Sequence, residues 1–207
     1  VTANYVIQYY FNNSSPPGSG PTGAPTPPGD FYDVGTIITA SVTSPWPGPA
    51  GTRYVCTGWI GTGSVPPYGT GTTVTFMLSA PSSITWTWQT QHYLTVQTSP
   101  PDITIIPGEG WYDAPTDVEL TAPSVAGYRF LYWDVDGTSQ GGGVNPITVT
   151  MNAPHTATAH YEEIAAPVGG YSVSLDSPAW TASPIIGYAM ILAIFSAVIT
   201  LIKRKRK

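Results

Sequence analysis

Two carboxylates lie two residues apart in the second half of the chain, Asp134 and Asp136, and Gly137 follows them. Alternate side chains at the end of a strand point to the same side, and a glycine then turns the chain, as at the start of a calcium-binding loop. The third oxygen ligand would have to come from Ser139 or Gln140, and no glutamate closes the loop. The pattern leaves open a calcium site or an ordinary hairpin turn, and the incomplete ligand set favours the turn.

The other residues that could act as metal ligands, nucleophiles or general acids do not converge. His155 and His160 are five residues apart on a predicted strand, which puts them on opposite faces, and Cys56 lies in the other half of the chain. Glu162 and Glu163 are adjacent and also point to opposite sides, and no Ser-His-Asp order is suggested. We therefore expect no catalytic site, no zinc site and no cofactor.

Two tryptophans have the chemistry to bind sugars, because an exposed aromatic ring beside polar groups can stack on a sugar ring. Trp46 lies in the proline-rich stretch of residues 44–49, and Trp86 lies on a predicted strand. We single out Trp46 and Trp86 as candidate carbohydrate-binding residues. The alternative for Trp46 is packing within its own loop.

The long loop from Asn12 to Asp30 is rich in proline and glycine, and it is either an exposed ligand loop or a solvated connection between strands. It begins with two overlapping N-glycosylation sequons, at Asn12 and Asn13. Both asparagines are therefore candidate glycosylation sites.

An internal repeat positions these candidates. Most of residues 1–163 divides into two copies that share their landmarks in the same order. The shared landmarks are a start at Tyr5 and Tyr93, an aromatic-Tyr-Asp triplet ending at Asp33 and Asp113, a tryptophan at Trp59 and Trp133, and a proline at Pro81 and Pro154. So many matches in one order indicate two copies of one structural unit.

The correspondence between the copies separates core positions from unconstrained ones. The pairs that bear on the candidate residues are Trp59 with Trp133, Trp88 with Tyr161, Trp86 with Ala159, and Cys56 with Phe130. An aromatic residue in both copies indicates a core position. Trp86 has an alanine as its counterpart, so the repeat does not constrain its surroundings.

Hydrophobic residues alternate with polar ones at a period of two throughout the repeats, as in Val74, Phe76 and Leu78. These segments are rich in Val, Ile, Thr and aromatic residues, and the turns between them are rich in Pro and Gly. The sequence predicts an all-β fold with two small domains, residues 1–91 and 92–163, joined at Gln91 and His92 with almost no linker. Such a junction favours a stiff arrangement over a flexible one.

The C-terminal part of the chain has the pattern of a membrane anchor. The eighteen residues from Ile185 to Ile202 carry no charge. As a helix they would be about 27 Å long, close to the thickness of a bilayer core. We predict a spacer at residues 164–183, a transmembrane helix at 184–202 and a cytoplasmic tail at 203–207. The residues that would stop transfer are Lys203, Arg204, Lys205, Arg206 and Lys207.

The charge of the chain excludes several partners. Residues 1–183 contain only two cations, Arg53 and Arg129, and all twelve Asp and Glu, which leaves a net charge of −10. Such a surface cannot neutralise phosphates, so we expect no binding to nucleic acid. Cys56 is the only cysteine and excludes an internal disulfide, which favours a prokaryotic surface protein over a secreted eukaryotic one.

The motifs of the second copy carry a family resemblance. An aromatic-Tyr-Asp-x-x-Thr pattern is followed by the segments from Gly127 to Trp133 and from Val149 to Pro154, and then by a closing Thr-Ala-x-Tyr. Together they resemble the divergent internalin B-type repeat of bacterial and archaeal extracellular proteins. The resemblance implies β-grasp-like or immunoglobulin-like modules of surface proteins that act as spacers or adhesive stalks and share no catalytic residues.

These observations predict a non-catalytic, single-pass protein of the cell membrane with its repeats outside the cell. The leading hypothesis is a surface stalk that spaces or displays extracellular domains. One alternative is an adhesin that binds surface glycans through Trp46 and the loop from Asn12 to Asp30. A second alternative is a subunit of an extracellular filament or of a lattice like an S-layer, built by pairing of strand edges.

Overall fold

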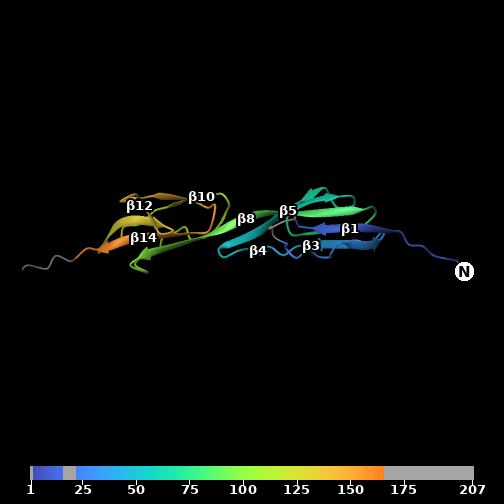
Figure 1. The fold of residues 1–207 in the computed structure, drawn as a ribbon, viewed down its shortest axis with the longest axis horizontal. Coiled ribbons are helices and arrows are strands. Elements are labelled where there is room, and N and C mark those ends of the chain that lie inside the picture. The colour runs from blue at the N-terminus through green and yellow to red at the C-terminus, as the bar shows by residue number, and fades with distance from the viewer. Residues whose placement is uncertain (1, 16–21, 166–207) are drawn as a thin grey trace, which may run out of the picture. The chain divides into compact units, whose positions relative to one another are not determined.

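The structure is a computed structural model that describes residues 2–15 and 22–165 (Figure 1). Strands and turns make up this part of the chain, which confirms the all-β expectation. Within it, no helix is long and apolar enough to span a membrane. The predicted spacer, transmembrane helix and basic tail lie outside the described residues.

The first half forms a mixed sheet in which the first and last strands are neighbours and run parallel. The order across this sheet is β2-β1-β8-β5-β6, and all pairs other than β1 with β8 are antiparallel. A separate antiparallel pair, β3 with β7, supplies further core residues, and β4 pairs with the start of β5. The strands are β1 (Gln8–Ser14), β2 (Asp30–Asp33), β3 (Ile37–Ser41), β4 (Trp46–Pro47), β5 (Thr52–Thr62), β6 (Tyr68–Gly69), β7 (Thr73–Met77) and β8 (Ser82–Ser99).

The second half repeats this pairing pattern, except that its described strands include no counterpart of β4. Its sheet has the order β9-β8-β14-β11-β12, with β8 and β14 parallel and the other pairs antiparallel. The pair β10 with β13 takes the place of β3 with β7. The strands are β9 (Gly110–Asp113), β10 (Asp117–Leu120), β11 (Tyr128–Val135), β12 (Thr138–Gly142), β13 (Ile147–Thr150) and β14 (His155–Glu163).

The registers fix how the two halves correspond. Tyr10 pairs with Phe31 as Tyr93 pairs with Trp111, so Tyr10 and not Tyr5 is the counterpart of Tyr93. The start of the repeat expected at Tyr5 was therefore five residues early. Both halves also have a register shift at one place, at Thr57 in β5 and at Leu131 in β11. This shared bulge puts Trp59 and Trp133 at equivalent core positions.

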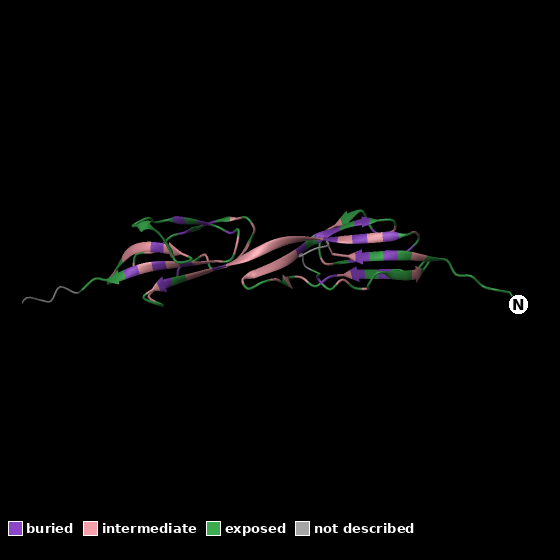
Figure 2. Cartoon of the chain, in the orientation of Figure 1, coloured by how far each residue is buried: buried purple, intermediate pink, exposed green. Residues whose placement is uncertain are grey.

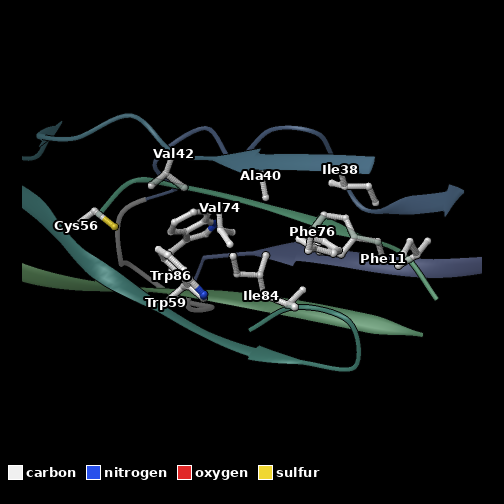
Figure 3. Close-up of a cluster of buried hydrophobic side chains, with 12 residues drawn as sticks. Phe11, Ile38, Ala40, Val42, Cys56, Trp59, Val74, Phe76, Ile84 and Trp86 are labelled. Carbon is white, nitrogen blue, oxygen red and sulfur yellow. The ribbon is translucent and has the colours of Figure 1, made fainter. Parts of the chain in front are cut away.

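The strands alternate buried and exposed residues, and the buried ones form one core in each half (Figure 2). In the first core Trp59 packs edge-on against Trp86, with ring centroids 5.8 Å apart, and Cys56 lies beside them (Figure 3). In the second core Trp133 lies 6.2 Å from Phe130, and Ala159 occupies the place of Trp86. The first core has the small Cys56 and the large Trp86, and the second core has the large Phe130 and the small Ala159 at the same two positions. This exchange keeps each core filled.

A single strand, β8, belongs to both halves. Its first part is the last strand of the first half, and its second part is the first strand of the second half. The predicted domain boundary at Gln91 and His92 falls inside this strand. The two halves are therefore joined by paired β-structure rather than by a loop.

Candidate functional site

Trp86 is not available to bind sugars, and its prediction as a ligand-binding residue was wrong. The side chain is completely buried. Side chains alternate between the two faces of β8, and Trp86 lies on the same face as Ile84, which is also completely buried. Its counterpart Ala159 is buried as well. The difference between tryptophan and alanine is therefore a difference in packing between the two cores, not in exposure.

Asn13 is not available for glycosylation in the folded protein, which corrects the prediction for this residue. Its side chain is 8% exposed, and both ends of the amide are hydrogen-bonded. Nδ2 donates to the carbonyl of Pro27 at 2.7 Å, and Oδ1 accepts from Nε1 of Trp86 at 2.9 Å. Asn13 thus satisfies a buried indole N–H that would otherwise have no partner. Asn12 points to the opposite side of β1 and is exposed.

Part of the long loop lies against the first core rather than in solvent. Thr26 pairs with Ser41, and Gly23 accepts a backbone hydrogen bond from Thr43 at 2.8 Å. Gly23 has φ of +56° and lies so close to the ring of Trp88 that a Cβ there would be 2.4 Å from it. Gly23 is therefore covered by the first core, whereas most of the other residues from 22 to 29 are exposed, as expected for a solvated connection. Trp46 is half-buried on β4, opposite Tyr54.

Asp134 and Asp136 are used by a turn between β11 and β12. Asp134 accepts a hydrogen bond from the backbone of Gly137 at 2.8 Å. Asp136 accepts from Thr156 N at 2.8 Å and lies 2.5 Å from Nδ1 of His155. Burial opposes ionisation of Asp136, but the hydrogen bonds from His155 and Thr156 outweigh it and hold the pKa of this carboxyl below its usual value. This geometry is that of a hydrogen-bonded hairpin turn.

Metal and thiol chemistry find no support in the described part of the chain. Among residues 2–15 and 22–165, no three His, Cys, Asp or Glu side chains are grouped so that they could hold a metal ion. Cys56 is buried, and burial raises the pKa of its thiol, which disfavours the reactive thiolate. Its Sγ lies 3.5 Å from the carbonyl oxygen of Gly58 and 3.4 Å from that of Gly71, and these two oxygens share its single S–H donor.

A hollow of about 670 Å³ lies between the second part of β8 and residues 100–109. Thr98, Glu109 and His160 are among its lining residues. The Glu109 carboxylate accepts hydrogen bonds from the Tyr93 hydroxyl at 2.9 Å and from Val96 N at 3.2 Å. This carboxylate therefore holds the loop against the unpaired edge of β8.

The junction between the halves is the most elaborate polar site in this part of the protein. Gln91 pairs with Arg53 of β5 on one side and with Asp113 of β9 on the other, and His92 is paired on both sides in the same way. The boundary residues of β8 are half-buried as a result (Figure 2). The strand is therefore paired on both sides at the point where one half ends and the next begins, and no hinge interrupts it.

Side chains extend this junction across the boundary. Arg53 Nε donates to Gln91 Oε1 at 2.7 Å, and Gln91 Nε2 donates to Asp113 Oδ1 at 2.8 Å. The guanidinium of Arg53 lies 4.4 Å from the ring centre of Trp111, within the range of a cation–π interaction. The Trp111 ring in turn packs edge-on against Tyr93, with centroids 5.2 Å apart. Arg53, one of the two cations in residues 1–183, thus contacts residues of both halves.

Further hydrogen bonds stabilise the junction. Tyr93 N donates to the carbonyl of Gly51 at 2.9 Å, and Gln89 Nε2 donates to the carbonyl of Ala114 at 2.9 Å. Thr52 Oγ1 lies 3.2 Å from Nδ1 of His92. Burial lowers the pKa of His92, and the nearby imidazole of His155 lowers it further. The junction therefore favours a neutral His92.

Sequence reasoning missed this site. The available signal was the position of Arg53 in residues 1–183, which contain only one other cation, Arg129. Its partner Trp111 lies 58 positions further on, and only the strand pairing brings the two together.

Residues 94–165 match the family model described as the divergent InlB B-repeat domain. This match makes the second half a repeat domain of an extracellular bacterial type, which is consistent with a surface protein and is typically non-catalytic. No curated protein and no solved structure is significantly similar to the chain.

Proposed function

We propose that the protein is a cell-surface stalk whose β-repeats hold other extracellular domains away from the membrane. The apolar residues 184–202 would anchor it, and the basic residues 203–207 would remain in the cytoplasm. The extracellular type of the second half supports this location, and the absence of a catalytic family supports a structural role.

The observation that carries the proposal is the pairing of Gln91 and His92 on both sides. Bending at this point would break backbone hydrogen bonds together with the contacts of Arg53, and each hydrogen bond contributes about 0.5–1.5 kcal/mol. A stalk transmits position only if its modules do not pivot freely. The continuous strand meets this requirement without a linker.

We also propose that the first half is a diverged copy of the same repeat. Its strand pairing, bulge and core tryptophan match those of the second half. The parallel pairs β1 with β8 and β8 with β14 differ from the antiparallel sheets of an immunoglobulin sandwich. They support the β-grasp-like topology of the two that the resemblance implied.

Distances between spin labels on the two halves test the stalk. The full chain in detergent micelles would carry Cys56→Ala together with Tyr68→Cys and Ser139→Cys, two exposed positions in different halves. We expect one narrow distance distribution from pulsed electron paramagnetic resonance. As a control, insertion of Gly-Ser-Gly-Ser between Gln91 and His92 should broaden it. A distribution in the uninterrupted chain as broad as in the insertion variant would refute the stalk.

The glycan-binding alternative now depends on Trp46 and the exposed parts of its neighbourhood, since Trp86 is buried. Its test is a titration of the chain with envelope sugars, in which binding is lost in Trp46→Ala. The filament alternative needs a free strand edge. The edge strand β2 has only four residues and has an aspartate at each end, features that oppose pairing between chains. The other edge strand, β12, is exposed and carries no charge, so the filament alternative depends on β12.

A further inference from the structure

The N-terminal end of the first repeat reproduces one side of the junction. Gln8 Nε2 donates to Asp33 Oδ1 at 2.9 Å, as Gln91 Nε2 donates to Asp113 Oδ1 at 2.8 Å. The strand registers make Gln8 the counterpart of Gln91, and Asp33 the counterpart of Asp113. The polar pair that holds Arg53 at the junction is therefore present a second time.

The aromatic pair of the junction recurs as well. Tyr10 and Phe31 meet edge-on with centroids 5.2 Å apart at 62°, and Tyr93 and Trp111 do so at 5.2 Å and 66°. The difference is in what covers them. Trp111 is half-buried beneath Arg53, whereas Phe31 is 61% exposed and Tyr10 is 43% exposed.

The segment before β1 has the sequence of the end of a repeat. Thr2, Ala3 and Tyr5 reproduce the Thr-Ala-x-Tyr that closes the second repeat at Thr158, Ala159 and Tyr161. Tyr5 also precedes Gln8 by three residues, as Trp88 precedes Gln91.

The backbone supports the same alignment. The carbonyl of Ile7 accepts a hydrogen bond from Val34 N at 2.9 Å, and that of Thr90 accepts one from Ala114 N at 2.9 Å. Tyr5, Val6 and Ile7 are 92%, 64% and 61% exposed. These residues thus resemble the first part of β8 without the neighbouring strands that cover it.

We propose that the surface formed by Gln8, Tyr10, Phe31 and Asp33 is a docking surface for a further β-repeat of the same polypeptide, joined through residues 2–7. Residues 2–7 form the end of the last strand of that repeat. The docked repeat places a cation above Phe31, as Arg53 lies above Trp111. The inference rests on the proposed stalk function and extends it from one junction to two.

Charge complementarity supports a cationic partner at this surface. Asp30 and Asp33 end β2, and the two cations of residues 1–183, Arg53 and Arg129, are each engaged elsewhere, on Trp111 and on Glu162. An arginine brought in at the position that Arg53 occupies would meet Gln8 and Phe31 and lie near Asp33. The surface therefore has the acceptors and the ring that such a side chain needs.

A second copy of this chain fits the surface less well. The far end of the second repeat has Gly127 at the position of Arg53 and Ile164 at the position of Gln91, as the hydrogen bond from Ile164 N to Gly127 O shows. Neither residue can supply the cation or the amide of the junction. The occupant is thus a repeat that carries the cation, not the end of another molecule of the same chain.

A fusion tests the proposal. Residues 8–84, with Asn13→Val and Cys56→Phe, would be placed before Thr2 of the full chain, so that residues 2–7 follow Ile84. In the added repeat Ala3 takes the place of Trp86, as Ala159 does in the second repeat. The two changes supply the valine and the phenylalanine that the second repeat has at the same positions, Val96 and Phe130. Hydrogen–deuterium exchange by mass spectrometry would follow residues 2–7, which occur only once. We expect their exchange to slow at least tenfold relative to the unfused chain.

Two substitutions identify the contact. Arg53→Ala in the added repeat and Phe31→Ala in the original should each reverse the slowing several-fold, and their combination should have no larger effect than either alone. Arg129→Ala in the original repeats is the matched control and should leave exchange unchanged. A second fusion, with residues 92–157 placed before Thr2, has Gly127 instead of the arginine and should protect residues 2–7 several-fold less.

The proposal is overturned if residues 2–7 exchange as fast in both fusions as in the unfused chain. It is also overturned if the unfused chain self-associates in sedimentation and Phe31→Ala abolishes the association, because a second copy would then be the occupant. In either case a persistently narrow distance distribution between the two repeats would leave the proposed stalk standing.

Discussion

The guanidinium of Arg53 lies 4.4 Å from the ring centre of Trp111, and the two residues belong to different repeats. The same side chain donates to Gln91, which is hydrogen-bonded to Asp113 of the second repeat. A cation over an aromatic ring contributes about 0.5–1 kcal/mol when exposed and about 2 kcal/mol when desolvated. Arg53 thus links the repeats through side chains at the same point where β8 links them through the backbone.

Removal of this cation should uncouple the repeats. We expect Arg53→Ala to lower the free energy of unfolding by about 1–2 kcal/mol, because it removes the cation–π contact and one hydrogen bond. It should also broaden the spin-label distance distribution. Arg129→Ala is the matched control, since its ion pair with Glu162 is exposed and contributes less than about 1 kcal/mol. Equal losses in the two variants would contradict a special role for Arg53.

The exchange of large and small residues between the cores can be tested by swapping them. Trp86→Ala should destabilise the first repeat by about 3–5 kcal/mol, because it leaves a cavity against Trp59. Cys56→Phe in the same chain should recover at least about 1 kcal/mol, because the second core combines Phe130 with Ala159 at the equivalent positions. Urea unfolding of the unchanged chain, the two single variants and the double variant measures the coupling between positions 56 and 86. Additive losses would show that the two positions do not share one cavity.

The hydrogen bond from Trp86 to Asn13 predicts a cost for a change that copies the second repeat. The counterpart of Asn13 is Val96, but Asn13→Val should destabilise the chain by about 1–3 kcal/mol, because it leaves the indole N–H and the Pro27 carbonyl without partners. Asn12→Val, on the exposed side of β1, should change stability by less than about 0.5 kcal/mol. Thermal unfolding of both variants gives the comparison.

The junction should weaken in mild acid. Burial lowers the pKa of His92 below its usual 6.5, so the unfolded chain binds a proton more readily than the folded one. Proton binding by His92 therefore does not affect stability above about pH 6.5, and it destabilises the folded chain as the pH falls below this value. We expect the urea midpoint to fall between pH 7.5 and pH 5, and the fall to be smaller in His92→Gln. Asp136 acts only at lower pH, because its pKa lies below 3.8.

Cys56 provides a probe of the first repeat. Its burial and raised thiol pKa predict slow reaction with a disulfide reagent under native conditions. The labelling rate should rise to that of the unfolded chain in urea and should rise already at low urea in Trp86→Ala. Rapid labelling of the native chain would contradict the packing of Cys56 beside Trp59 and Trp86.

The sequence by itself determined the local features of this protein. Alternation of apolar and polar residues indicated strands, and the repeated landmarks paired Trp59 with Trp133 as core residues. Such patterns depend only on residues close together in the sequence, so they can be recognised without knowing what the strands pack against. The turn at Asp134 followed from the same local information.

Only the tertiary structure decided which faces are covered and which distant residues meet. Period-two alternation shows that Trp86 and Ile84 share a face, but the strands paired elsewhere in the chain determine that this face is inside. The partnership of Asn13 with Trp86 and that of Arg53 with Trp111 join residues far apart in sequence, so no local pattern contains them. The same reason explains why the counterpart of Tyr93 proved to be Tyr10, since the register depends on pairing with β2 and β9.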